Sequence, residues 1–152
     1  MLNVKCAILI FALVPALLHA TMARASNLSS GEVAAVKRCG YGASNYNLSN
    51  RQLFDSCRHA AGIYATHVRT ADGAEEREQY LKSEALMEIY AATPAAALGL
   101  SSLSIHYRSD ARAIWSRLAS SGYSADIRSQ SSRSIQCFFK HDMNACHSLF
   151  PR

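Results

Sequence analysis

An amphipathic segment with a cysteine on its apolar face spans residues 49–69. Ser49 and Gln52 form a capping-box pattern, in which each side chain pairs with a backbone N–H that the first helical turn leaves unbonded. Apolar residues recur at spacings of three and four, which places them on one face of a helix: Leu53, Phe54, Cys57, Ala60, Ala61, Tyr64 and Val68. We therefore expect a helix that begins at Ser49 and buries this face in a core.

The remaining patterns predict an all-α fold, a single-domain disulfide-stabilised bundle of five to six helices. No sustained alternation of β-branched residues occurs, and no Asn-Gly or Asp-Gly turn joins two candidate strands. The polar run 129–134 is expected to be weakly structured. The first of the other predicted helices covers residues 32–38, and the second is capped by Asp72 and Glu75 and ends near residue 92. The chain then restarts at Thr93-Pro94 into a helix over residues 95–107. A compact helix runs from a cap at Ser109-Asp110 to a stop at Gly122, and a last helix runs from residue 135 toward residue 150.

Residues 1–25 have the pattern of a secretory signal peptide. Lys5 precedes an apolar run over residues 6–18, and Ala23-Arg24-Ala25 is a small-x-small cleavage site. The run is shorter than the roughly 20 residues of a transmembrane helix. Cleavage would leave a helical domain of residues 26–152, a length that suits one core. We therefore expect a periplasmic or secreted protein that is not held in a membrane after processing.

The expected mature chain keeps four cysteines, Cys39, Cys57, Cys137 and Cys146. An even number in an oxidising compartment favours two disulfides. We prefer the pairs Cys39–Cys57 and Cys137–Cys146, and the main alternative is Cys57–Cys137. The second preferred pair requires a helix break near residues 142–144, because cysteines nine residues apart on one unbroken helix face opposite sides. The alternative pair needs no break, so the sequence leaves the choice open.

The charge pattern argues against nucleic-acid binding. The net charge is +5, and it falls to +3 if Lys5 and Arg24 leave with the signal peptide, because no acidic residue lies among the first 25. The basic residues are scattered, and no arginine-rich run or aromatic-basic alternation occurs. A mildly positive protein of this kind suits contact with an acidic protein partner.

The segment of residues 41–50 consists almost wholly of Gly, Ser, Asn and Tyr. This composition is typical of turns. It is also typical of binding surfaces, where tyrosine supplies amphipathic contact area and small polar residues adapt their hydrogen bonds. An ordinary loop whose tyrosines fold onto the core remains the other interpretation. The residues that we select as candidates for partner contact are Tyr41, Asn45, Tyr46 and Asn47.

One segment has a weak similarity to an enzyme family. Cys137 precedes the pair His141-Asp142 by four residues, as in secreted phospholipases A2, where the histidine is the general base and the aspartate binds calcium. The glycine-containing segment 39–42, which is the similar loop here, lies about a hundred residues upstream, and ten residues follow Asp142. A small secreted hydrolase that uses His141 and Asp142 is therefore an alternative function.

A zinc site is a further alternative, because Cys137, His141, Cys146 and His147 have the side chains of zinc ligands. Exported cysteines in even number are more often paired with each other than bound to metal. We therefore expect no metal and no cofactor.

Other catalytic patterns are weak. His59 and His67 lie eight residues apart without a neighbouring carboxylate in the pattern, and Glu32 and Asp55 have no setting that predicts acid–base chemistry on a glycan. No nucleophile elbow or HExxH motif occurs. The chain is therefore not predicted to be an enzyme.

A second resemblance points to a binding protein. Residues 53–57, Leu-Phe-Asp-Ser-Cys, place a cysteine early in an amphipathic helix, and residues 135–141 place Cys137 before two aromatic residues and His141. In these features the chain resembles the periplasmic immunity proteins that neutralise type VI secretion amidases. The resemblance covers residues 50–150 and transfers no binding residue. It implies an exported all-helical protein, a possible homodimer, that blocks the active site of its cognate effector.

Our leading hypothesis is therefore an exported helical binding protein, plausible as an immunity or inhibitor protein, with the segment 41–50 as one contact surface. A periplasmic carrier of a small apolar ligand is a further hypothesis. It predicts an enclosed cavity lined by residues such as Trp115 and Phe138.

Overall fold

A computed structural model of the chain describes residues 27–42 and 45–149. The predicted signal peptide, residues 1–25, lies outside the described residues. Within the described ranges the protein has six helices and no strand, and two disulfides link Cys39 to Cys57 and Cys137 to Cys146. The predicted all-α, disulfide-stabilised bundle is confirmed. The helices are α3 (Ser30–Gly40), α4 (Asn50–Thr70), α5 (Ala74–Ala97), α6 (Ser101–Leu118), α7 (Ala125–Lys140) and α8 (Met143–Leu149).

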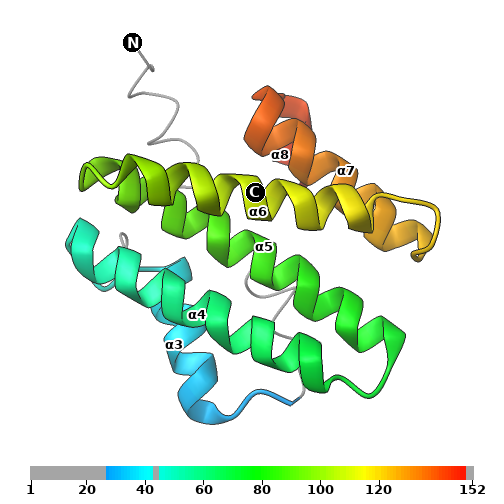
Figure 1. The fold of residues 1–152 in the computed structure, drawn as a ribbon, viewed down its shortest axis with the longest axis horizontal. Helices are drawn as coiled ribbons and strands as arrows, with labels where there is room; N and C mark the ends of the chain where they lie inside the picture. The colour runs from blue at the N-terminus through cyan, green and yellow to red at the C-terminus, as the bar shows by residue number, and fades with distance from the viewer. Residues whose placement is uncertain (1–26, 43–44, 150–152) are drawn as a thin grey trace.

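Helix α5 is the central element of the bundle and runs between α4 and α6 (Figure 1). Small residues on α5, among them Ala85, Ala91 and Ala95, are fully buried, so the neighbouring helices approach its backbone closely. Helix α3 packs beside α4, α7 packs against α6, and α8 packs against α7 (Figure 1). No described helix has the length and apolarity required to cross a membrane.

The predicted start of α4 is confirmed. The Ser49 hydroxyl oxygen accepts the Gln52 N–H at 3.3 Å, and the Gln52 side-chain oxygen accepts the Ser49 N–H at 3.0 Å. Of the predicted apolar face only Val68 is partly exposed. The helix α3 starts earlier than predicted, because Ser29 and Glu32 form the same type of capping box.

The predicted Asp72 cap of α5 is wrong. Gly73 occupies the N-cap position without a side-chain hydrogen bond, and the helix begins at Ala74. The predicted restart at Thr93-Pro94 is also wrong, since α5 continues through Pro94 to Ala97. Pro94 is itself buried, so packing compensates for the backbone hydrogen bond that proline cannot donate.

Gly99, which was expected to lie inside a helix, follows the end of α5 by two residues. Gly99 has a φ of 75°, a left-handed conformation that favours glycine. The N–H of Leu100 donates to the Ala95 carbonyl at 2.9 Å, and the N–H of Gly99 donates to the Ala96 carbonyl at 3.0 Å. This Schellman pattern satisfies the last carbonyls of α5.

Two predicted interruptions are absent. Ser109 and Asp110 lie inside α6, where Asp110 pairs with His106 one turn earlier at 3.2 Å. The polar run 129–134 belongs to α7. There the small side chains of Ser131 and Ser134 are buried, and the Ser134 hydroxyl donates to a carbonyl of its own helix. Packing therefore overrides the weak helix propensity of serine.

The break between α7 and α8 explains the second disulfide. His141 ends α7 in a left-handed conformation with a φ of 56°, and the Asp142 carboxylate then accepts the N–H groups of Asn144 and Ala145 at 2.9 and 3.3 Å. This turn reverses the chain so that Cys146 meets Cys137. The break that our preferred pairing required is confirmed, one residue earlier than expected.

Candidate functional site

The loop between α3 and α4 is fixed at both ends. The disulfide Cys39–Cys57 joins the last turn of α3 to the second turn of α4 across a separation of 18 residues. Backbone hydrogen bonds close the loop internally: the N–H of Asn45 donates to the Tyr41 carbonyl at 2.8 Å, and the N–H of Leu48 donates to the Gly42 carbonyl at 2.9 Å. The loop therefore has a defined backbone path at its described residues.

Gly42 lies where no side chain fits. An ideal Cβ at this position would be 2.5 Å from the Arg38 carbonyl oxygen, 2.7 Å from the Leu53 Cδ1 atom and 2.9 Å from that of Leu48. Real Cβ atoms do not approach other atoms so closely. The glycine thus allows the loop to pack directly on the helix ends.

The structure separates the predicted contact residues into two groups. Tyr41 is only 9% exposed and belongs to the hydrophobic core, and burial, together with the nearby Tyr46, raises the pKa of its hydroxyl. Tyr46 is 50% exposed, and Asn45 and Asn47 are exposed on either side of it. Asn47 has a φ of 48°, which asparagine tolerates better than most residues. We call Asn45, Tyr46 and Asn47 the loop surface.

The residues of the hydrolase and zinc hypotheses have structural contacts. His141 and Asp142 end one helix and begin the next, as described above. Cys137 and Cys146 are joined to each other, so their sulfurs are not thiolate ligands. Among the described residues no group of three or more His, Cys, Asp or Glu side chains is arranged to bind a metal ion.

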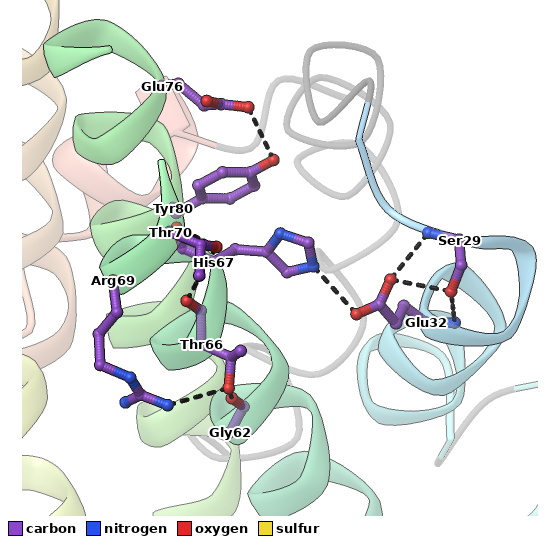
Figure 2. A network of polar contacts seen from close by, with 9 residues as sticks. All are labelled: Ser29, Glu32, Gly62, Thr66, His67, Arg69, Thr70, Glu76 and Tyr80. Carbon is purple, nitrogen blue, oxygen red and sulfur yellow. Dashed lines mark hydrogen bonds and ion pairs between the residues drawn. The ribbon is translucent and has the colours of Figure 1, made fainter. Parts of the chain in front are cut away.

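The structure joins one residue of the histidine pair considered above to one residue of the carboxylate pair. Glu32 accepts a hydrogen bond from His67, at 2.9 Å, and so ties α3 to α4 (Figure 2). The His67 ring also lies 5.0 Å from the ring of Tyr80, between centroids. Hydrogen bonds from Ser29 and His67 lower the pKa of Glu32 to about 2. His59 and Asp55 are exposed.

The surroundings of Trp115 and Phe138 leave little room for a ligand. Their rings stack with centroids 5.3 Å apart and planes inclined by 9°. The cavity beside them has a volume of about 20 Å³, which is enough for a single water molecule. A cavity of this size at the predicted position does not accommodate a small apolar ligand.

With the fold and the loop surface defined, the chain was compared with known proteins. No family model, curated protein or solved structure matches it. The resemblance to amidase immunity proteins therefore stays a prediction.

Two glutamates of α5, Glu84 and Glu88, belong to none of the motifs considered above. Glu88 is seven residues after Leu81 and three after Ala85, so it occupies the apolar stripe of its own helix. A carboxylate on a buried stripe is unusual, because charged residues are rarely buried without a partner. This departure from the periodic pattern is the sequence signal that identifies the position.

Proposed function

We propose that this chain is an exported helical binding protein that contacts another protein through the loop surface. More specifically, we propose an immunity or inhibitor protein that occludes the active site of a secreted cell-wall-degrading effector. The observation that carries the proposal is the half-exposed Tyr46, flanked by Asn45 and Asn47, on a loop whose backbone is fixed at both ends.

The two disulfides indicate an oxidising environment, because intramolecular disulfides persist mainly in exported proteins. Periplasmic residence follows from the signal-peptide pattern of residues 1–25 and belongs to the proposal.

The geometry of the loop favours recognition. Binding loses free energy when a loop must be ordered, and a loop that is already fixed avoids most of this loss. Here the Cys39–Cys57 disulfide and the Leu48–Gly42 hydrogen bond provide the ordering before a partner arrives. An exposed tyrosine on such a loop offers a large contact area and has few rotatable bonds. Tyr46 is therefore our candidate for the residue that contributes most binding energy.

The inhibitor part of the proposal is supported by the resemblance over residues 50–150. In the amidase immunity proteins, inhibition results from occlusion of a groove. A fixed loop with one exposed aromatic side chain suits that task, since Tyr46 can enter a groove while α3 and α4 remain packed behind it. His141 is the C-terminal cap of α7, and the Asp142 carboxylate accepts backbone N–H groups at the start of α8. No observation therefore favours a second, hydrolytic function.

The proposal is tested with the disulfide-bonded protein as bait in periplasmic extract. The retained partner is identified, and its hydrolysis of cell-wall peptidoglycan is measured at increasing concentrations of the bait. We expect the wild-type chain to inhibit hydrolysis, and Tyr46→Ala to weaken binding at least about tenfold, as for a central aromatic contact.

The matched control is Ile105→Ala, which removes another exposed large side chain, 68% exposed, far from the loop in sequence. It should bind and inhibit like the wild type. Equal binding by the Tyr46→Ala and wild-type chains would remove the loop surface from the proposal. A retained partner whose wall hydrolysis is unaffected would remove the inhibitor function.

A further inference from the structure

Two glutamates, Glu84 and Glu88, lie one helical turn apart on α5, and charged residues of both α4 and α6 act on Glu84. Glu84 is partly exposed, whereas Glu88 is only 9% exposed. The Oε2 atom of Glu88 is buried and has no hydrogen-bond partner among the described residues. Most buried polar atoms in proteins are paired, and an unpaired carboxylate oxygen is a costly exception that requires an explanation.

Among residues 27–42 and 45–149, no Lys, Arg or His side chain forms an ion pair with either carboxylate. The ion pairs within 4.0 Å in the described residues are His67–Glu32 and His106–Asp110, and neither includes Glu84 or Glu88. More distant charges do act on the pair or on the neighbouring Tyr107. Arg69 of α4 and Asp110 and Arg117 of α6 act on Glu84, and Glu84 and Asp110 act on Glu88. Arg58 of α4, Glu88 and Asp110 act on Tyr107.

The chemistry of the pair selects a particular kind of ligand. Two carboxylates without bound donors attract a group that carries both positive charge and several N–H bonds. A metal ion would need further ligands, and no group of three suitable side chains occurs in the described residues. A guanidinium or ammonium group brings its own donors, and the partly exposed Glu84 gives it access from solvent.

We propose that Glu84 and Glu88 form a binding site for one primary ammonium or guanidinium group, which enters from solvent beside Glu84 and donates hydrogen bonds to both carboxylates. This site is separate from the loop surface and does not depend on the proposed function.

Binding at neutral pH must release a proton. Burial, with smaller contributions from the charges of Glu84 and Asp110, raises the pKa of Glu88 to about 8, so this carboxyl is protonated at pH 7. The bound cation favours the ionised carboxylate, and the proton of Glu88 passes to solvent. The affinity should therefore rise by about 50-fold from pH 6 to pH 8, as the ionised fraction of a group with a pKa of about 8 rises.

The test is a titration of the full disulfide-bonded chain, followed by calorimetry and by NMR shifts of the α5 amides. The probes are N-acetyl-arginine amide, N-acetyl-lysine amide and putrescine. We expect saturable binding, a heat that changes with the ionisation enthalpy of the buffer, and at least tenfold weaker binding at pH 8 in Glu88→Gln and Glu84→Gln. Binding of the blocked amino acids would indicate a protein side chain as the natural ligand, and binding of putrescine alone a free polyamine.

The matched control is Glu75→Gln, which removes an exposed carboxylate from the first turn of the same helix and should bind like the wild type. The pH profile is repeated in His106→Gln, which removes the histidine that contacts Asp110, so that the pH dependence that remains is not due to this histidine. Absence of saturable binding to all three probes, equal binding by the Glu88→Gln chain, or an affinity independent of pH would overturn the proposal. Calcium binding that depends on Glu88 would overturn it in favour of a metal site.

Discussion

At the scale of single residues, two carboxyl groups respond to opposite environments. Glu32 accepts hydrogen bonds from Ser29 and His67, which favour its charged form and lower its pKa to about 2. Glu88 is buried on α5, and its Oε2 atom has no hydrogen-bond partner in the part of the chain that the structure describes; burial favours the neutral form and raises the pKa to about 8. Since both start from a value near 4.5 in the unfolded chain, they make the stability of the fold depend on pH in opposite directions.

Glu88→Gln should make the unfolding free energy fall less as the pH rises toward 8. The folded chain holds a proton on Glu88 more tightly than the unfolded chain, so this group's contribution is fully present below pH 4.5 and is lost as the pH rises through about 8. Urea unfolding between pH 5 and pH 8 should give a smaller decline of the unfolding free energy in the variant. Glu75→Gln should keep the wild-type slope, and an unchanged slope in Glu88→Gln would contradict this environment.

Glu32→Gln should act on the acidic side. The folded pKa is lowered, so the stabilisation is present above pH 4.5 and is lost as the pH falls toward 2. We expect a melting temperature lower than the wild-type value by a few degrees at pH 7, about the size of a lost capping interaction, and a much smaller difference at pH 2, where about half of the Glu32 carboxyls are protonated in the folded chain. Thermal scans followed by circular dichroism measure this. A difference that persists unchanged at pH 2 would mean that the charge of Glu32 is not responsible.

At the scale of helices and loops, the sequence predicted what local chemistry determines. The Ser49–Gln52 box and the apolar face of α4 depend only on neighbouring residues, and both were predicted correctly. Pro94 and Ser131 behave differently, because their places inside helices depend on burial against other elements. Packing of this kind has no local signal, so it could not be predicted from the sequence.

The candidate site follows the same division. The composition of residues 41–50 indicated an exposed loop. It could not distinguish the buried Tyr41 from the exposed Tyr46, because both tyrosines are flanked in the sequence by small or polar residues. The position of Glu88 on the apolar stripe was visible in the sequence. Its missing partner became evident only when α4 and α6 were placed around α5.

Gly42→Ala should destabilise the fold through the loop that it anchors. The added Cβ would lie 2.5 Å from the Arg38 carbonyl oxygen, which is backbone and moves only with its helix. We expect the unfolding free energy to fall by about 2 kcal/mol, as for overpacked sites. The control is Gly62→Ala, where nothing lies within 4 Å of the added Cβ, and helix propensity should raise the free energy by up to about 1 kcal/mol. Equal effects of the two substitutions would contradict the close packing at Gly42.

At the scale of the whole molecule, one disulfide is placed near each end of the described bundle. Cys39–Cys57 joins α3 to α4 and fixes the loop that carries Tyr46. Cys137–Cys146 closes the turn between α7 and α8, away from that loop in sequence. The two bonds therefore stabilise the same fold, but only the first orders the proposed contact surface.

Removal of the disulfides one at a time should reveal this difference. Replacement of Cys39 and Cys57 by serine should lower the unfolding free energy by about 3 kcal/mol, and replacement of Cys137 and Cys146 by about 2.5 kcal/mol. The second effect is smaller because that disulfide closes a shorter loop, with a sequence separation of 9 residues against 18. Only the replacement of Cys39 and Cys57 should accelerate hydrogen exchange at the N–H groups of Asn45 and Leu48, which form hydrogen bonds within the loop. Equal acceleration in both variants would contradict a local ordering role.

The most direct measurement for the loop surface is photo-crosslinking inside the native cell envelope. The photoreactive residue p-benzoyl-phenylalanine replaces Tyr46, and in a control chain it replaces the exposed Ala113 of α6. The proposed function predicts one adduct with a secreted wall-degrading protein from position 46 and none from position 113. No adduct at position 46, the same adduct from both positions, or an adduct with only a second copy of this chain would contradict it.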